Sequence, residues 1–249
     1  MVTVELPIKP PARLRGHKTL RYFFSGMAAY CAVILLFAFV PEFQKYAAGV
    51  FPIAWVLHIH AVIMFGWVGA FALQAYLGAT GRTGLHQQLG RYAIAIGWLA
   101  WASMIFVEFR GFVAHPLPED PAEYDWNLPG PFVYLTFGVF LAWAVRERRR
   151  PEWHKRLMTF ALFLSIEAAI QRYHWIPRDY GFVGVAAVLD ASLLAPIAVY
   201  DLRALEGRIH PATVRGALLL LISEGVLFAL WGTHTWRHFA SAVAHAIHT

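Results

Sequence analysis

The chain has 249 residues, of which 59% are hydrophobic and only 14% carry a charge. Water-soluble domains have about 25% charged residues, so this composition excludes an ordinary soluble protein and indicates a multi-pass membrane protein. The net charge of +6 is concentrated in a few loops, which indicates membrane topology and contact with anionic lipid, not nucleic-acid binding.

Residues 1–19 form a basic, proline-containing segment without an apolar core, so we expect a cytoplasmic tail and not a cleaved signal peptide. Seven apolar stretches follow, each close to the roughly 20 residues that cross a bilayer. Their expected ranges are 20–41, 53–77, 91–113, 130–146, 157–176, 182–201 and 215–235. The predicted fold is therefore an all-α bundle of seven transmembrane helices over 20–235, followed by an interfacial amphipathic segment, 236–249.

Positive charges fall on alternate loops of this arrangement. Of the 21 Lys and Arg residues, 16 lie in the N-terminal tail and in the loops after the second, fourth and sixth spans. The opposite loops carry acidic residues, as in the run AHPLPEDPAEYDW. The positive-inside rule then places the N-terminus in the cytoplasm and the C-terminus in the periplasm.

The second span carries polar residues on one helical face. His60, Trp67 and Gln74 recur at helical spacing, together with Met64 and Phe71. Because lipid tails offer no partner for an imidazole or an amide, we expect this face to point into the bundle. His58 lies on roughly the opposite side of the same helix.

Further ionisable residues are expected at a similar depth in the outer leaflet. They belong to the third, fifth and sixth spans: Glu108, Arg110, Glu167, Arg172, His174 and Asp190. Charged groups are costly inside hydrocarbon and often mark functional sites. The structural alternative is that these residues only form ion pairs and hydrogen bonds between helices.

In the functional interpretation, these outer residues form one site with three roles. The metal ligands are His58, His60 and His174. The catalytic, proton-transferring carboxylates are Glu108, Glu167 and Asp190. The cofactor-binding residues are Arg110, Arg172, Trp67 and Gln74.

Three other histidines occupy equivalent positions at the cytoplasmic edge. His86, His154 and His210 lie just before or at the start of the third, fifth and seventh spans. They are a candidate inner-side metal group. The alternative is that each one anchors the start of its own helix at the headgroups.

Several of these residues belong to four short motifs, which occur along the chain in this order: HA..M..W......Q, H..LGR, RRRPEWHKRLM and GRIHPA. This pattern resembles a widespread, uncharacterised family of bacterial polytopic integral membrane proteins over spans two to seven. The matching residues are His60, Met64, Trp67, Gln74, His86, Leu89, Gly90, Pro151, His154, Lys155, Arg156, Leu157, Met158, Arg172, Asp190, Asp201, Gly207, Arg208, His210 and Pro211. The resemblance implies a multi-pass protein of the bacterial inner membrane. The segment HIHAVIMFGW is also similar, over one helix, to His-bearing spans of haem-copper membrane proteins, but the His-His pair of that ligand set is missing.

We therefore expect an integral membrane redox protein that holds haem b or a non-haem transition metal (iron, copper or zinc) in the outer half of the bundle, with coupled proton or electron transfer. A periplasmic or membrane redox protein, or a quinone, would be its electron partner. One alternative is a proton-coupled transporter in which Pro196 breaks the sixth span near Asp190. Another is a non-catalytic accessory subunit of a larger membrane complex. A retinal protein is excluded, because all four lysines lie outside the spans.

Overall fold

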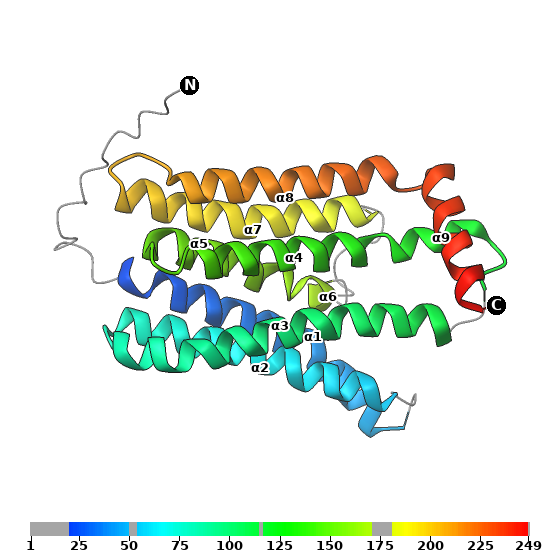
Figure 1. The fold of residues 1–249 in the computed structure, drawn as a ribbon, viewed down its shortest axis with the longest axis horizontal. Helices are drawn as coiled ribbons and strands as arrows, with labels where there is room; N and C mark the ends of the chain where they lie inside the picture. Colours follow the sequence, from blue (N-terminus) through cyan, green and yellow to red (C-terminus); the bar gives the residue numbers. More distant parts are fainter. Residues whose placement is uncertain (1–19, 50–53, 115–116, 171–180, 249) are drawn as a thin grey trace.

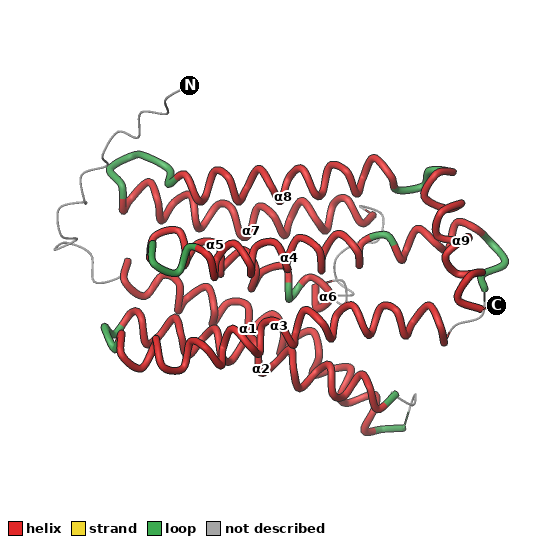
Figure 2. Tube along the Cα trace, viewed as in Figure 1, coloured by secondary structure: helices red, strands yellow, loops and turns green. Residues whose placement is uncertain are grey.

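The computed structural model describes residues 20–49, 54–114, 117–170 and 181–248, and within these ranges all regular structure is helical (Figures 1 and 2). The elements in chain order are η1 (Leu20–Tyr22), α1 (Phe23–Ala47), α2 (Trp55–Ala79), α3 (Thr83–Ala114), η2 (Pro121–Asn127), α4 (Pro129–Arg146), α5 (Pro151–Leu164), α6 (Glu167–Ile170), α7 (Gly181–Ala204), α8 (Pro211–Leu230) and α9 (His234–His248).

The surface of the bundle is that of a membrane protein. Five helical segments in the described ranges are long and apolar enough to cross a bilayer. Large apolar side chains point outward from them, such as Phe37 at 69% and Val62 at 73% exposed. Extended apolar surface of this kind is rare on soluble monomers, so lipid is its natural environment. The seven-span count and the orientation remain predictions.

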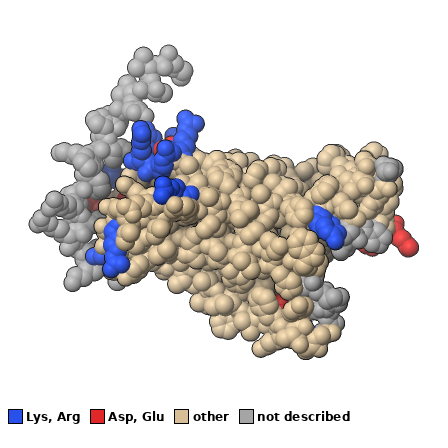
Figure 3. All heavy atoms as spheres, turned by 60° about the horizontal axis from the view of Figure 1, so that its bottom comes forward, with Lys and Arg blue, Asp and Glu red and all other residues tan. Residues whose placement is uncertain are grey.

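Most helices run along the long axis of the molecule, and α9 lies across one end (Figure 1). The turns after α2, α4 and α7 gather at the other end, where Lys and Arg side chains cluster (Figure 3). We call this the basic end; its described cations include Arg82, Arg146, Arg148, Arg149, Arg150 and Arg208. We call the end covered by α9 the far end.

Aromatic side chains meeting small residues build the core. Phe140 of α4 and Phe160 of α5 are fully buried and stack with ring centres 4.9 Å apart. Gly216 of α8 leaves the space that the Phe160 ring needs, because a Cβ at that position would lie 2.5 Å from the ring. Trp67 of α2 is fully buried against Gly97 of α3 in the same way. These contacts hold α2 against α3, and α8 against the α4–α5 pair.

The fifth span differs from the sequence-based prediction, and the break at Pro196 that the transporter alternative required is absent. The fifth was expected to be continuous over 157–176, but α5 ends at Leu164, a turn follows at 165–166, and α6 begins at Glu167. The Ser165 hydroxyl donates to the Leu162 carbonyl at 2.5 Å, a local bond that competes with helical pairing. In the sixth, Pro196 does not break the helix, because α7 continues through it to Ala204.

The C-terminal segment forms a helix, as expected, and it also packs on the loop between α3 and α4. Arg237 of α9 forms a salt bridge with Asp125 of η2 at 2.6 Å. The Trp236 indole donates to the Tyr124 carbonyl at 2.9 Å. α9 therefore closes the far end of the bundle through specific polar contacts.

Candidate functional site

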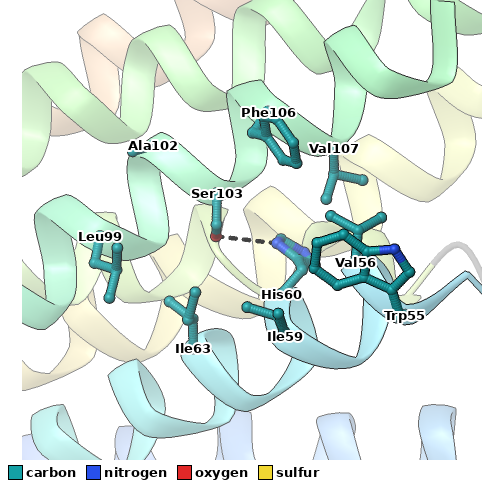
Figure 4. A pocket seen from close by; sticks show the side chains of 10 residues that line it. All are labelled: Trp55, Val56, Ile59, His60, Ile63, Leu99, Ala102, Ser103, Phe106 and Val107. Atoms are coloured by element: carbon teal, nitrogen blue, oxygen red, sulfur yellow. Dashed lines mark hydrogen bonds between the residues drawn. The ribbon is translucent and has the colours of Figure 1, made fainter. Parts of the chain in front are cut away.

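His60 lies at a pocket between α2 and α3, in the half of the bundle nearer the far end. The pocket has a volume of about 260 Å³ (Figure 4). His60 Nδ1 lies 3.0 Å from the Ser103 hydroxyl oxygen, and that hydroxyl donates to the Ala100 carbonyl at 2.8 Å. A serine hydroxyl has a single proton, so Nδ1 of His60 must be the donor in its bond to Ser103.

The two histidines of α2 face different helices. The His58 ring packs against Tyr46 of α1, with ring centres 5.0 Å apart, whereas His60 faces α3. Two residues of separation on a helix place side chains on nearly opposite sides, which explains the divergence. Arg172 and His174 lie outside the described residues, as does the side chain of Asp190, so the ligand set of His58, His60 and His174 stays a prediction.

Glu108 is tied to the start of α4. Its carboxyl group accepts a hydrogen bond from the Asn127 side chain. It also packs on Gly130, where a Cβ would lie 2.7 Å from the Glu108 carboxyl carbon. Arg110 is exposed and forms no ion pair with another described residue, so the structure does not bring Glu108 and Arg110 together.

Glu167 is buried, with 8% of its surface exposed, and it is the first residue of α6, directly after the turn that interrupts the fifth span. The short helix α6 packs against α1. Among the described residues, no three His, Cys, Asp or Glu side chains lie close enough together to hold one metal ion. The outer site is therefore not assembled by the described residues alone.

At the basic end, the structure brings two of the three inner histidines together. His86, in the first turn of α3, and His154, in the first turn of α5, have ring centres 6.4 Å apart and perpendicular planes. His86 Nδ1 lies 3.2 Å from the Gln74 carbonyl oxygen, and His154 Nδ1 lies 2.8 Å from the Ala144 carbonyl oxygen. A carbonyl only accepts, so both Nδ1 atoms carry a proton, and in each neutral ring the lone pair is on Nε2.

Burial keeps the His154 ring in the form that binds a metal. Burial lowers the pKa of His154, and the neighbouring His86 charge acts in the same direction, while the hydrogen bond to Ala144 opposes both. His154 is therefore neutral at physiological pH. A neutral imidazole is the form that binds metals.

Gln74 adds a third polar group beside His86. Its main-chain carbonyl accepts the His86 proton, and its side-chain Oε1 is buried without a hydrogen-bond partner in the described part of the chain. Oε1 lies on the α3 side of α2, 3.8 Å from the place where a Cβ on Gly90 would be. An unsatisfied buried acceptor costs about 1–3 kcal/mol, so this oxygen is a candidate ligand contact. Trp67, from the same helical stripe, is fully buried and its indole nitrogen also has no described partner.

His210 belongs to a separate contact network. Its Nδ1 accepts the Ala212 amide at 3.0 Å and so caps the N-terminus of α8. Its ring packs on Trp153 with centres 5.6 Å apart. The Nδ1 atom of His210 is thus unprotonated, the opposite of His86 and His154, and the structure does not bring His210 into their pair.

A buried ion pair lies beside His210. Arg156 of α5 and Asp201 of α7 are both fully buried and form a salt bridge. Arg156 also donates to Glu152 at 2.7 Å, and Asp201 accepts the Thr213 hydroxyl at 2.6 Å and the His210 amide at 3.0 Å. The network joins α5, α7 and α8 at the basic end.

Sequence reasoning missed this network. Arg156 and Asp201 were named only as members of the family pattern, and no contact between them was predicted. The available signal was their position, since both lie at the same membrane boundary, one at the start of a span and the other at the end of one. Charges of opposite sign at matching depth in neighbouring spans favour pairing.

No protein-family model, curated protein sequence or solved structure matches the chain.

Proposed function

We propose that the chain is an integral membrane redox protein that holds a metal, either haem iron or a transition-metal ion, between His86 and His154. The observation that carries the proposal is the pair of imidazoles from two different helices, each with its Nδ1 proton bound to a main-chain carbonyl. Metal-binding histidines characteristically donate their second nitrogen in this way, which fixes the tautomer and leaves Nε2 for the metal.

The spacing of the pair supports the same proposal. Metal–imidazole bonds of about 2.0–2.1 Å put the ring centres of two ligands on opposite sides of one metal roughly 6 Å apart. The His86 and His154 rings lie 6.4 Å apart. His86 and His154 would hold a haem iron through their Nε2 atoms, or would hold copper, iron or zinc together with the Gln74 side-chain oxygen. Of these, haem, iron and copper support electron transfer.

The test is metal and haem content of the purified protein. We expect a Soret band if the metal is haem iron, or about one transition-metal ion per chain by elemental analysis. His86→Ala and His154→Ala should each abolish that content. His58→Ala is the matched control, because the His58 ring packs on Tyr46 away from the pair, and it should retain full content.

His60→Ala separates this proposal from an outer-leaflet site. If His60→Ala removes the metal while His86→Ala retains it, the inner pair is refuted and the ligands lie in the outer half. A wild-type protein from native membrane with neither a Soret band nor bound metal would refute both versions.

The interrupted fifth span favours a second candidate function, a proton-coupled transporter. Breaks in transmembrane helices commonly accompany ion and substrate sites, and here the break at 165–166 is followed by the buried Glu167. Glu167→Gln should abolish proton-coupled uptake into proteoliposomes, whereas the exposed Glu206→Gln should not. Wild-type proteoliposomes without proton movement would exclude this function.

We further propose seven spans with the basic end in the cytoplasm of a bacterial cell, as the resemblance and the loop charges imply. The cluster of cations at one end (Figure 3) supports this orientation. Single cysteines at Arg149 and Glu119, introduced into a Cys31→Ser background, should react with a membrane-impermeant thiol reagent from opposite sides. Labelling of the Arg149 position from the periplasmic side would reverse the orientation.

A further inference from the structure

The pocket between α2 and α3 is apolar except at one edge. Its walls include Ile63, Ala102 and Phe106, and its polar edge is the hydrogen-bonded pair of His60 and Ser103 (Figure 4). Because Ser103 donates to a main-chain carbonyl and accepts from His60, the imidazole is held in a single orientation. A fixed polar group at the edge of an apolar cavity is typical of small-molecule sites, where the apolar walls bind and the polar group orients the ligand.

The pocket opens on the lipid-facing surface. Ile59, Leu99 and Phe106 line it and are each about half exposed, at 50%, 52% and 52%. These side chains belong to helices that are apolar enough to cross a membrane. His60 lies about 8 Å along α2 from its first residue, at 1.5 Å per residue. A ligand would therefore enter from the hydrocarbon region of the bilayer.

Size narrows the class of ligand. The volume is about 260 Å³, just below the range of about 300–1,000 Å³ for sites that enclose a whole drug-sized molecule. The pocket matches a single substituted ring and leaves a longer tail in the lipid. A phospholipid acyl tail would fill the apolar walls, but it has no atom that can bond to the imidazole–hydroxyl edge.

We propose that this pocket binds the head ring of a lipid-soluble quinol, with a ring hydroxyl donating to the remaining lone pair of the Ser103 hydroxyl oxygen and the tail in the bilayer. The site lies about 25 Å from His86, counted from Ser103 along α3 at 1.5 Å per residue. Quinol binding needs no metal at the basic end, so this inference stands or fails separately from the proposed function.

The test measures binding of a short-tailed ubiquinol analogue, kept reduced in oxygen-free buffer, to the full chain in nanodiscs of one saturated phosphatidylcholine. We expect saturable binding of about one molecule per chain. Ala102→Phe, which places a ring at the pocket wall, should weaken binding more than tenfold. Ala95→Phe is the matched control, since Ala95 is an exposed α3 residue outside the pocket, and it should bind as the wild type does.

The polar edge is tested separately. Ser103→Ala, which removes the accepting oxygen, should weaken binding about 3- to 10-fold, as expected for the loss of one hydrogen bond. His60→Ala, which removes the group that orients the Ser103 hydroxyl, should weaken binding as well. An alkane with the same tail but no ring should not compete. Unchanged binding by Ala102→Phe, or equal competition by the ringless tail, would overturn the proposal, and the second result would identify the pocket as an acyl-chain site.

Discussion

Replacement of Asp201 by alanine should strongly destabilise the basic end. Asp201 accepts Arg156 Nε at 3.0 Å, the Thr213 hydroxyl at 2.6 Å and the His210 amide at 3.0 Å. Both Asp201 and Arg156 have no exposed surface. The alanine variant would leave a buried guanidinium with Glu152 as its remaining carboxylate partner, together with a hydroxyl and an amide that have lost their acceptor.

The expected loss in the free energy of unfolding can be worked out from these broken contacts. Breaking a buried ion pair by removing one partner costs about 3–5 kcal/mol, and each orphaned buried donor costs about 1–3 kcal/mol. The two costs overlap, because all the donors share one carboxylate, and Glu152 still pairs with Arg156. We therefore expect a loss of about 3–5 kcal/mol in the free energy of unfolding, or a lowering of Tm on the order of 10 °C.

Thermal unfolding in mild detergent, followed by circular dichroism, measures this effect. Glu152→Gln is the control, because the Glu152 side chain is 49% exposed and such a pair contributes at most about 1 kcal/mol. The reasoning would be refuted if Asp201→Ala shifted Tm no more than Glu152→Gln does. The double variant Arg156→Met/Asp201→Leu should be less destabilised than Asp201→Ala, because no unpaired charge is left buried.

Gly97→Ala should destabilise the bundle by about 1–3 kcal/mol through overpacking, since its Cβ would lie 2.7 Å from the Trp67 ring. Gly69→Ala, with open space around it, should be neutral or slightly stabilising in the same unfolding assay, and equal effects would contradict this account. Burial is the main cause that lowers the pKa of His210 to about 4, whereas the unfolded residue titrates near pH 6.5. The stability from neutral His210 is thus complete above about pH 6.5 and declines as the pH falls toward 4. His210→Asn, which keeps an N-cap acceptor without a titrating group, should flatten that decline in a Tm-against-pH series, and an unchanged acid slope would count against the assignment.

The helical class was predictable because bilayer thickness sets the length of an apolar run. α4 begins at Pro129 and ends at Arg146, within one residue of the predicted 130–146. The continuous fifth span was wrong, since α5 ends at Leu164. At this point the backbone changes to shorter-range bonding, as in the Ile166 amide that donates to the Phe163 carbonyl at 3.1 Å, which a hydropathy pattern does not register.

For the candidate site, too, the sequence identified the residues but not the contacts between them. The spacing of histidines at helix starts singled out His86, His154 and His210 together, and the sequence favoured the outer residues over them. Which of the three meet depends on how the helices are rotated against one another, which is a property of packing. The structure pairs His86 with His154, while His210 turns back to cap its own helix.

The contact between α9 and η2 should constrain how the sequence evolves. Asp125 is 5% exposed and its carboxylate is bound by Arg237, which lies 112 positions later in the chain. A mutation of either Asp125 or Arg237 leaves the other residue without its ion-pair partner. Single replacements should therefore be selected against. Homologous genes are expected to retain both residues or to exchange both, and the two codons should evolve as a unit despite their separation.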